Sequence, residues 1–590
     1  MNGNVVRLFL ALAITISLAA PDIAATATTS VEEDYTKFCA PCHRQDRLGF
    51  TGPPLIPGHF SKTNENQLTD VIAEGLPATQ MPPFREVLPA EKIAALAKYI
   101  QTPVGKVEWT NIDMAQSRKE VVVEYAPRAK RIQDLQEVIM VVERGTRKLA
   151  VLSGNPPRVF ASYYVGAVHG GLKFTHNLGR VFSIARDGKV TSFDLRSLRG
   201  EIQMKVGVSS RAIAISKDDN FIAVANNLPS NVVLFTSDMT PAHEIKIDGT
   251  VGGIYGLYED NSFLLTFRDK SEIWLIEAKP PFAIKKIKTP EPFEDISISP
   301  RKNLMIAARR DGEKMYVFDY RTQKTLATFP AGGFPHLASA VFFAKGGELF
   351  AALNHIKKAE VTIISIDKLK VVSRVPIEGA GFFVRTHSFT PYIWAGTNSE
   401  KIALIDKADF KTVKYITPLP GHKTEHVEFN ARGNFALISI PEVNGSVMIF
   451  HSQTLAPVTS IPFNTPKGKY NSMNKTFPDH AFDGDQGAIP APAPSSSWAP
   501  PARKLASHGA KGQFIYQESC MGCHHQKFDA FGPSFAEIAS IRSRDQIRSH
   551  IQAPSSMFKT LGYRRNSMPT IPLSEEQLDA VTEYIISFKE

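Results

Sequence analysis

The chain has 590 residues, of which 43% are apolar, and it carries a formal net charge of +10. This length predicts three or four domain-sized pieces, and the apolar content is sufficient for proper hydrophobic cores. The charge alone would suit nucleic acid, but the lysines and arginines are dispersed and form no basic block or helix-turn-helix pattern, which argues against such a partner. A basic surface of this kind fits an acidic redox partner.

The N-terminus has the pattern of an export signal. Arg7 precedes an apolar run over residues 8–20, and the small residues that follow predict a signal peptide over residues 1–27, cleaved near residues 25–27. The apolar run is too short for a comfortable membrane span, and no later stretch is apolar enough. We therefore expect an exported protein that does not span a membrane.

The four cysteines of the chain fall in two C-x-x-C-H motifs, the first at Cys39, Cys42 and His43. Two thiols at this spacing can each form a thioether to haem, and the histidine can then ligate the iron. A zinc half-site or a thioredoxin-like redox pair is the alternative, but zinc would need a second cysteine pair nearby. The motif therefore predicts covalent haem c, which together with the export signal predicts a periplasmic protein.

A methionine supplies the expected sixth ligand of this haem. Met81 lies in a Pro-flanked loop, and Leu88 to Glu91 open an amphipathic helix that ends near Ile100. This order predicts an all-α class I cytochrome c domain over residues 28–105, and a His/Met pair suits electron transfer. The alternative is that Met81 is only a packing residue.

The middle of the chain, residues 106–475, contains a repeated hairpin. Each unit has two apolar runs joined by a turn, and successive units start 41 to 45 residues apart, at Gln136, Gly179, Asn220, Asn261, Asn303, Glu348, Pro391 and Asn434. Eight such units predict an all-β, eight-bladed β-propeller, because a sandwich would not hold so even a period. The loops on one face of a propeller can hold a flat ligand.

A cytochrome c domain joined to an eight-bladed propeller resembles the cytochrome cd1 group, whose propeller holds haem d1 without a covalent bond. The resemblance spans about residues 31–475 and includes local matches. His169, followed by the Arg186-Asp187-Gly188-Lys189 turn, is similar to the proximal iron ligand of the group and its hairpin. The resemblance implies that Arg186 and Arg211 bind the haem d1 carboxylates and that His336 lies on the distal side.

Two branches of this group differ at the distal side. Nitrite reductases use two distal histidines, but the first of these positions here reads Pro292 to Ile296, with Glu294 and Asp295 and no histidine. Acidic groups would repel nitrite and are poorer proton donors near neutral pH. This difference weakens the nitrite reductase interpretation.

The dihydro-haem d1 dehydrogenase branch, which desaturates a propionate to an acrylate, is more similar. The similar segments are Arg47 to Gly49 with Gly52-Pro53, Lys423 to Phe429, and Gly468 to Asn471. The catalytic histidine and a nearby tyrosine of that branch map onto His426 and Tyr470.

The resemblance implies that a histidine with a pKa near neutrality takes the carbon-bound proton, while a tyrosine orients the carboxylate or relays a proton. The electrons leave one at a time through haem c. His426 as a strand-end histidine bonded to backbone is the structural alternative. His176, His355 and His387 are expected to be structural or exposed.

A segment rich in proline, alanine and serine, residues 476–506, predicts a semi-rigid linker to a second cytochrome c domain over residues 507–590. The tail repeats the order of the first cytochrome. Its haem cysteines and axial ligands are expected at Cys520, Cys523, His524 and Met568. Met557 is the alternative sixth ligand. As a hypothesis, this domain accepts the second electron or passes electrons to a soluble partner.

Together these features predict a periplasmic c–d1–c protein with two covalent haem c groups and one non-covalent haem d1 or dihydro-haem d1. The expected activity is oxidation of dihydro-haem d1 to haem d1. A nitrite reductase with an extra haem c and a non-catalytic haem d1 carrier or electron-transfer protein are the alternatives. The expected partners are the tetrapyrrole, a periplasmic electron-transfer protein and an acceptor of haem d1.

Overall fold

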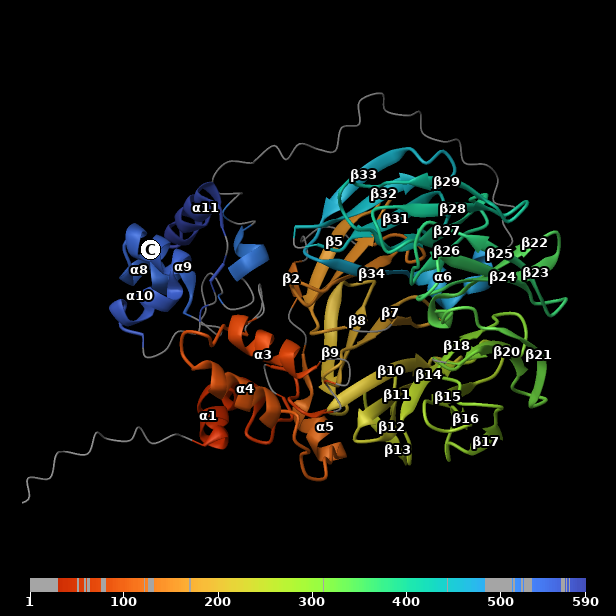
Figure 1. Cartoon of the computed structure of the whole chain (residues 1–590), viewed down its shortest axis with the longest axis horizontal. Helices are drawn as coiled ribbons and strands as arrows, with labels where there is room; N and C mark the ends of the chain where they lie inside the picture. Colours follow the sequence, from red (N-terminus) through yellow and green to blue (C-terminus); the bar gives the residue numbers. More distant parts are fainter. Residues whose placement is uncertain are drawn as a thin grey trace, which may run out of the picture.

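A computed structural model gives the arrangement of the chain (Figure 1). It describes residues 30–49, 52–57, 60, 64–75, 81–120, 123–125, 132–168, 171–310, 312–442, 444–482, 512, 515–520, 524, 533–563, 568, 570–571 and 573–589. The predicted signal peptide, His169, Cys523 and most of the predicted linker lie outside these residues.

The first cytochrome region is helical, as predicted. Its helices are α1 (Val31–Phe38), α2 (Ala40–His43), α3 (Glu65–Glu74) and α4 (Ala90–Tyr99). Ser30 begins α1 with a capping box, in which its hydroxyl accepts from the Glu33 amide. Apolar side chains of α1, α3 and α4 form one core, which Met81 joins. The predicted closing helix is therefore confirmed.

The described residues of the middle region form eight antiparallel sheets, which confirms the eight-bladed propeller. The strands of blades 2 and 3 are β6 (Lys173–Phe174), β7 (Arg180–Ile184), β8 (Lys189–Asp194), β9 (Arg199–Lys205), β10 (Ser209–Ile215), β11 (Phe221–Leu228), β12 (Asn231–Thr236) and β13 (Pro241–Lys246). Those of blades 4 and 5 are β14 (Val251–Gly256), β15 (Ser262–Phe267), β16 (Glu272–Glu277), β17 (Ile284–Lys288), β18 (Asp295–Ile298), β19 (Leu304–Ala308), β20 (Lys314–Asp319) and β21 (Lys324–Pro330).

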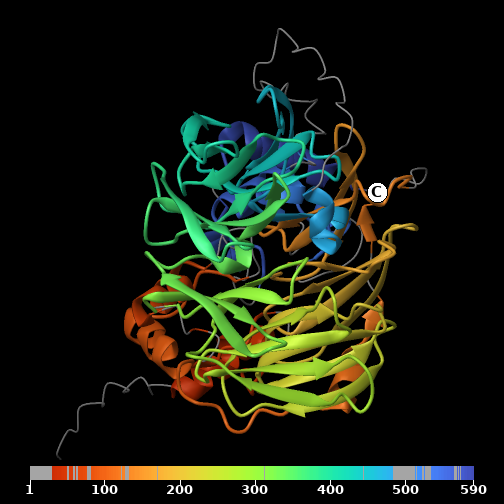
Figure 2. The ribbon, with the colours of Figure 1, turned by 90° about the vertical axis from the view of Figure 1, so that its right-hand side faces the viewer.

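The later blades follow the same order. The strands of blades 6 and 7 are β22 (Val341–Lys345), β23 (Glu348–Asn354), β24 (Glu360–Ser365), β25 (Lys370–Pro376), β26 (Val384–Arg385), β27 (Tyr392–Gly396), β28 (Ile402–Asp406) and β29 (Thr412–Ile416). A short 3-10 helix, η2 (Leu337–Ser339), precedes β22. Blade 8 consists of β30 (Glu425–Phe429), β31 (Phe435–Ile440), β32 (Ser446–His451) and β33 (Pro457–Pro462). In Figures 1 and 2, the yellow and green strands of the earlier blades lie on one side of the molecule and the cyan strands of the later blades on the other.

Blade 1 joins the two ends of the propeller. Its strands are β3 (Ile139–Glu143), β4 (Lys148–Ser153), β5 (Arg158–Tyr164) and the inner strand β34 (Pro466–Asn471). β34 pairs with β3 in the register Met140 with Tyr470. Two short strands, β1 (Lys119–Glu120) and β2 (Val123–Tyr125), extend blades 2 and 1 at their outer edges. The repeated hairpin pattern did not predict β1 or β2, because strands of two or three residues are too short to show an alternating apolar pattern.

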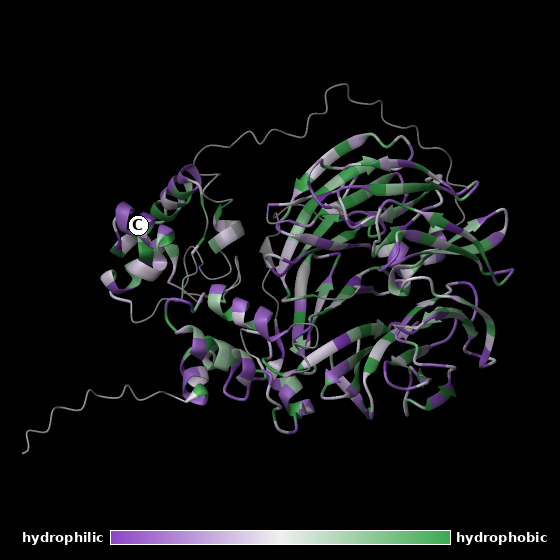
Figure 3. Cartoon of the chain, in the orientation of Figure 1, coloured by the Kyte–Doolittle hydropathy of each residue, from purple (hydrophilic) through white to green (hydrophobic). Residues whose placement is uncertain are grey.

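Each blade packs its apolar strand faces against its neighbours. Figure 3 shows apolar colour concentrated in the propeller strands and polar colour in the connecting turns. Outer strands are more polar: in β17 the lysines are exposed and only Ile287 is buried. Lysines at an outer edge discourage pairing with another chain.

The first cytochrome docks on the outer strand of blade 2. The Lys205 ammonium of β9 donates to the carbonyl of Leu48, in the segment that follows the C-x-x-C-H motif (3.1 Å). Trp109 precedes α5 (Asn111–Ser117), and its indole donates to the Lys205 carbonyl (2.8 Å) while its ring lies 4.6 Å from the ammonium. Lys205 therefore links the cytochrome, the connecting segment and the propeller.

After β34 the chain forms α6 (Ser472–Thr476) and η3 (Pro478–Ala481). Phe482, which follows η3, packs in a core of the propeller. In the tail, the described elements are η4 (Tyr516–Cys520), α8 (Phe535–Ile541), α9 (Arg544–Gln552), α10 (Pro554–Thr560) and α11 (Glu575–Ile586). α11 is the closing helix that the sequence predicted. Within the described part of the chain, no helix has the length and apolar character needed to cross a membrane.

Two of the histidines that the sequence analysis set aside are buried in blades 6 and 7, and they predict acid sensitivity. Burial lowers the pKa of His355 and of His387 to about 4, whereas an unfolded histidine titrates near 6.5. Between these values the unfolded chain binds more protons, so the free energy of unfolding falls by about 1.4 kcal/mol per pH unit per histidine as the pH drops from 6.5 to 4.

Denaturant midpoints at pH 7.5 and 5.0 measure this effect. His387→Gln should reduce the pH dependence, whereas the same change at His422, which is exposed and paired with Glu442, should not. A midpoint that is equal at both pH values would contradict the assignment.

Candidate functional site

The C-x-x-C-H segment of the first cytochrome is built to hold a haem. Cys39 and His43 are buried, and α2 places Cys42 one turn from Cys39. The His43 Nδ1 donates to the Pro53 carbonyl (2.7 Å), which leaves the Nε2 lone pair for a metal. Burial lowers the pKa of His43, so the ring is neutral, as a ligand must be. These residues fit a covalent haem c.

Two further residues hold this segment in place. A Cβ on Gly52 would lie 2.4 Å from Cε1 of His43, so the imidazole occupies the space that glycine leaves. The buried Arg47 guanidinium donates to the carbonyls of Tyr99 (2.6 Å) and Thr102 (3.0 Å), at the end of α4. The haem-binding segment is therefore fixed to the closing helix.

The second cytochrome repeats the arrangement. The His524 Nδ1 donates to the Pro533 carbonyl (2.7 Å), and burial lowers the pKa of His524. Met568 packs in the same core as Cys520, whereas Met557 lies on α10 outside that core. This packing favours Met568 as the sixth ligand, although Cys523 lies outside the described residues.

The structure brings His426 and Tyr470 together at the inner strands of blades 8 and 1. Their ring centroids lie 5.5 Å apart, with the rings edge to face. His426 is 3% exposed and has a φ of 52°, a left-handed conformation that costs a non-glycine residue energy. Strain of this kind, on a buried histidine beside a tyrosine, is typical of a functional site.

The expectation of a pKa near neutrality for His426 is wrong, because its buried, cationic surroundings disfavour the charged imidazole. Burial, together with the charges of Lys469 and Arg385, holds the pKa of His426 well below its usual value, so the imidazole is neutral. The Lys469 amide donates to its Nδ1 at 3.4 Å, a length that constrains the tautomer only weakly. Burial raises the pKa of Tyr470 to about 12, so its hydroxyl is a proton donor at neutral pH.

The predicted iron ligand His169 lies outside the described residues, but its neighbours are described. Val168 bridges to Ala185 at the approach to the predicted hairpin turn. A Cβ on Gly171 would lie 3.6 Å from the Tyr470 ring. The segment on either side of His169 therefore approaches both the Arg186 turn and Tyr470.

The ring of Phe383 contacts both His426 and His336. Its centroid lies 4.7 Å from that of the His426 ring and 5.8 Å from that of the His336 ring. The His336 Nδ1 donates to the Phe382 carbonyl (2.7 Å), which leaves an Nε2 lone pair. His336 can therefore ligate a metal or accept a proton.

The acidic pair that replaces the distal histidine is engaged with backbone. Both oxygens of Asp295 accept amides of η2, from Leu337 (3.0 Å) and Ala338 (2.9 Å), so this carboxylate fixes the segment that begins with His336. Glu294 accepts from the Arg310 amide (2.8 Å). These bonds give Asp295 a positioning role.

Arginines from successive blades gather near the Arg186 turn. Burial and the charges of Arg211 and Arg268 lower the pKa of Arg186 to about 10, and burial with Arg211 and Arg310 lowers that of Arg268. The backbone places two of these segments side by side, because the Ser210 amide, next to Arg211, donates to the Arg186 carbonyl (3.2 Å). That Arg186 and Arg211 bind the haem d1 carboxylates stays a prediction.

Arg268 and Arg310 were not among the residues predicted to bind haem d1. A signal was present, because an Arg-Asp pair follows the first strand of the repeated hairpin in three blades, at residues 186–187, 268–269 and 310–311. Lys173, Lys475 and Arg385 were missed as well, and no repeat marks them.

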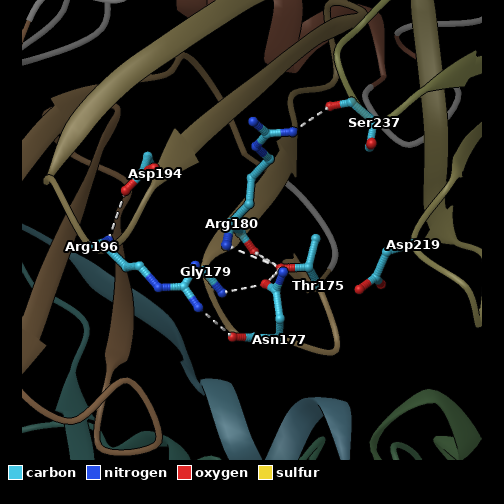
Figure 4. A pocket seen from close by; sticks show the side chains of 8 residues that line it. All are labelled: Thr175, Asn177, Gly179, Arg180, Asp194, Arg196, Asp219 and Ser237. Atoms are coloured by element: carbon cyan, nitrogen blue, oxygen red, sulfur yellow. Dashed lines mark hydrogen bonds between the residues drawn. The ribbon is translucent and has the colours of Figure 1, made fainter.

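A separate polar pocket of about 220 Å³ lies at the opposite ends of β7 and β8 from Arg186 (Figure 4). Its arginines are engaged: Arg180 donates to the Ser237 carbonyl (3.0 Å) and Arg196 to that of Asn177 (3.3 Å). Nearby, His176 pairs with Asp219 (2.7 Å). These contacts hold blades 2 and 3 together and bring none of the predicted site residues into the pocket.

Three family models match the chain. They are the cytochrome D1 heme domain over residues 133–475, subunit III of cbb3-type cytochrome c oxidase over residues 26–100, and cytochrome c over residues 509–589. The first covers the propeller, and the other two cover the flanking helical regions.

The chain is 30% identical to the dihydro-heme d1 dehydrogenase of Pseudomonas aeruginosa, over 75% of this chain and 93% of that protein. It is 24% identical to a nitrite reductase of Stutzerimonas stutzeri, over 77% of this chain and 94% of that protein. A solved structure of dihydro-heme d1 dehydrogenase NirN in complex with DHE aligns with a TM-score of 0.71 at 29% identity, covering 76% of this chain and all of that one. The chain therefore belongs to the cytochrome D1 heme domain family, with cytochrome c domains at both ends of its propeller.

Proposed function

We propose that this protein oxidises dihydro-haem d1 to haem d1, converting a propionate side chain to an acrylate. The observation that carries the proposal is the contact of His426 with Tyr470 beside the segment that holds His169. The 30% identity to a dihydro-heme d1 dehydrogenase supports it. The protein works in the periplasm, after removal of a signal peptide over residues 1–27.

The side chain loses two protons and two electrons in this reaction. His426, kept neutral by its low pKa, accepts one carbon-bound proton. The Tyr470 hydroxyl donates to the substrate carboxylate and relays the second proton to water, while the two electrons pass to haem c. His169 would hold the substrate iron, His336 would lie on its distal side, and the arginines of blades 2 to 5 would hold its other carboxylates.

Each cytochrome holds a covalent haem c, through Cys39 and Cys42 with His43 and Met81, and through Cys520 and Cys523 with His524 and Met568. Haem c, when bound, supplies one-electron transfer. His43 and Met81 would hold the iron of the first haem c, and the part of the linker after Phe482 lets the second domain reach a periplasmic electron-transfer protein. The finished pigment passes to an acceptor protein.

A turnover experiment separates this function from the alternatives. Oxidised full-length protein mixed with dihydro-haem d1 should convert the pigment to haem d1, with two electrons appearing in haem c for each pigment. Acid-acetone extraction and visible spectra measure both. Steady conversion of nitrite to nitric oxide would support a nitrite reductase instead, and tight binding without conversion would support a carrier.

A further inference from the structure

Two cations, Lys475 and Arg385, lie near the His426–Tyr470 pair. Lys475 lies on α6 and Arg385 on β26, and Lys173 lies on the inner strand β6, which packs against α6. The Lys475 ammonium lies 5.7 Å from the Tyr470 ring centroid. A Cβ on Gly171 would lie 3.2 Å from the same ammonium. Lys475 thus fills the space between the catalytic tyrosine and the segment of His169.

The Glu428 carboxylate lies near these cations but pairs with Arg385 and with neither lysine. Glu428 lies 3.9 Å from the Arg385 guanidinium, and burial raises the pKa of Glu428. Neither Lys173 nor Lys475 makes an ion pair with a described residue, and each is half-buried. Burial and their mutual repulsion lower the pKa of Lys475 to about 7, and burial lowers that of Lys173 to about 8.

Positive charges held together without counter-ions destabilise a folded chain unless an anion joins them. The arginines of blades 2 to 5 lie near the Arg186 turn, whereas Lys475 lies beside Tyr470, with Lys173 on the strand that packs against α6. Two separate cationic groups can therefore fix the rotation of a macrocycle that bears several carboxylates.

We propose that Lys173 and Lys475 form the subsite for the carboxylate of the propionate that is oxidised, and so select which side chain faces His426. This inference rests on the proposed function. Arg385, which donates to the Ser339 (2.9 Å) and Val384 (2.9 Å) carbonyls, is a fixed charge behind this subsite. The lysines, with flexible stems, make the direct contacts with the carboxylate.

The test uses full-length protein with its haem c groups and visible titration with dihydro-haem d1. Lys173→Met and Lys475→Met should each weaken binding by about tenfold, the size expected for loss of one charge-assisted hydrogen bond. Lys475→Arg should retain binding. Lys401→Met is the matched control, because Lys401 is a partly exposed lysine of blade 7 paired with Glu378. This variant should bind dihydro-haem d1 as tightly as the wild type.

Two further measurements exclude a merely structural role. The thermal midpoint of the pigment-free protein should stay equal or rise in Lys475→Met, because an unbalanced cation is removed. Wild-type protein should prefer the free acid of the pigment to a derivative that is esterified only at the propionate to be oxidised, and the double lysine variant should bind the two alike.

Unchanged affinity in both single variants, or an unchanged preference for the acid in the double variant, overturns the subsite. A wild-type protein that binds no dihydro-haem d1 would instead overturn the proposed function.

Discussion

Replacing His426 with alanine is expected to lower the rate of dihydro-haem d1 oxidation by a factor of about 10² to 10⁴, the usual contribution of a positioned general base. Pigment binding should change little, because the proposed iron ligand His169 and the arginines of blades 2 to 5 are unaltered. Rapid mixing with the substrate, followed at the haem c absorption bands, measures the rate. The control is His422→Ala, an exposed histidine of the segment that leads into blade 8.

A second variant separates a base from a hydrogen-bond donor. His426 has a positive φ, which asparagine tolerates well. His426→Asn should therefore fold and still donate a hydrogen bond, but it cannot accept the proton and should be as slow as the alanine variant. Turnover close to that of the wild type in His426→Asn would show that this side chain is not the base.

The pH profile gives an independent check on the same residue. Because the pKa of His426 lies well below its usual value, the base form persists as the pH falls from 8 to 6. The rate should therefore show no decline near pH 6.5 that depends on His426. A decline at that pH which disappears in His426→Asn would contradict the assigned protonation state.

Replacing Gly52 with alanine is expected to displace His43, because the new Cβ would lie 2.4 Å from its ring. Overpacking of this kind costs about 1–3 kcal/mol, and here it acts on the iron ligand. We expect a lower melting temperature for the first cytochrome and a changed absorption spectrum of its haem. The second cytochrome, which has its own motif, provides an unchanged reference in the same sample.

Gly105→Ala is the matched control, since no heavy atom lies within 4 Å of a Cβ at that position. It should leave the spectrum and the melting temperature unaltered. A wild-type spectrum and stability in Gly52→Ala would show that the His43 imidazole can move aside, and that its close packing on Gly52 is not needed to hold the haem.

Features carried by local patterns could be predicted from the sequence. The 41–45 residue period predicted the eight blades, and the order of motif, methionine and closing helix predicted both cytochrome regions. Each of these patterns is local in the sequence. His426 and Tyr470 could be named from a resemblance, but their contact could not, since it depends on how blades 8 and 1 meet.

The rest depends on contacts between distant segments. Lys205 reaches Leu48 across 157 positions, and nothing in either segment marks the other. Asp295 occupies the position of a distal histidine in the sequence, and only the amides of η2 reveal its positioning role. Lys475 is an unremarkable lysine until α6 brings it beside the Tyr470 ring.

The closure of the ring by β34 has a consequence for the order in which the site matures. Tyr470 lies on that last strand, and its partner Met140 lies 330 positions earlier, so this pairing has one of the longest sequence separations in the fold. A chain that is still being synthesised can form blades 2 to 7 but lacks Tyr470 and Lys475. Blade 1 and the contact of His426 with Tyr470 therefore form only with the final strand, so an incomplete chain has an open ring and no assembled site.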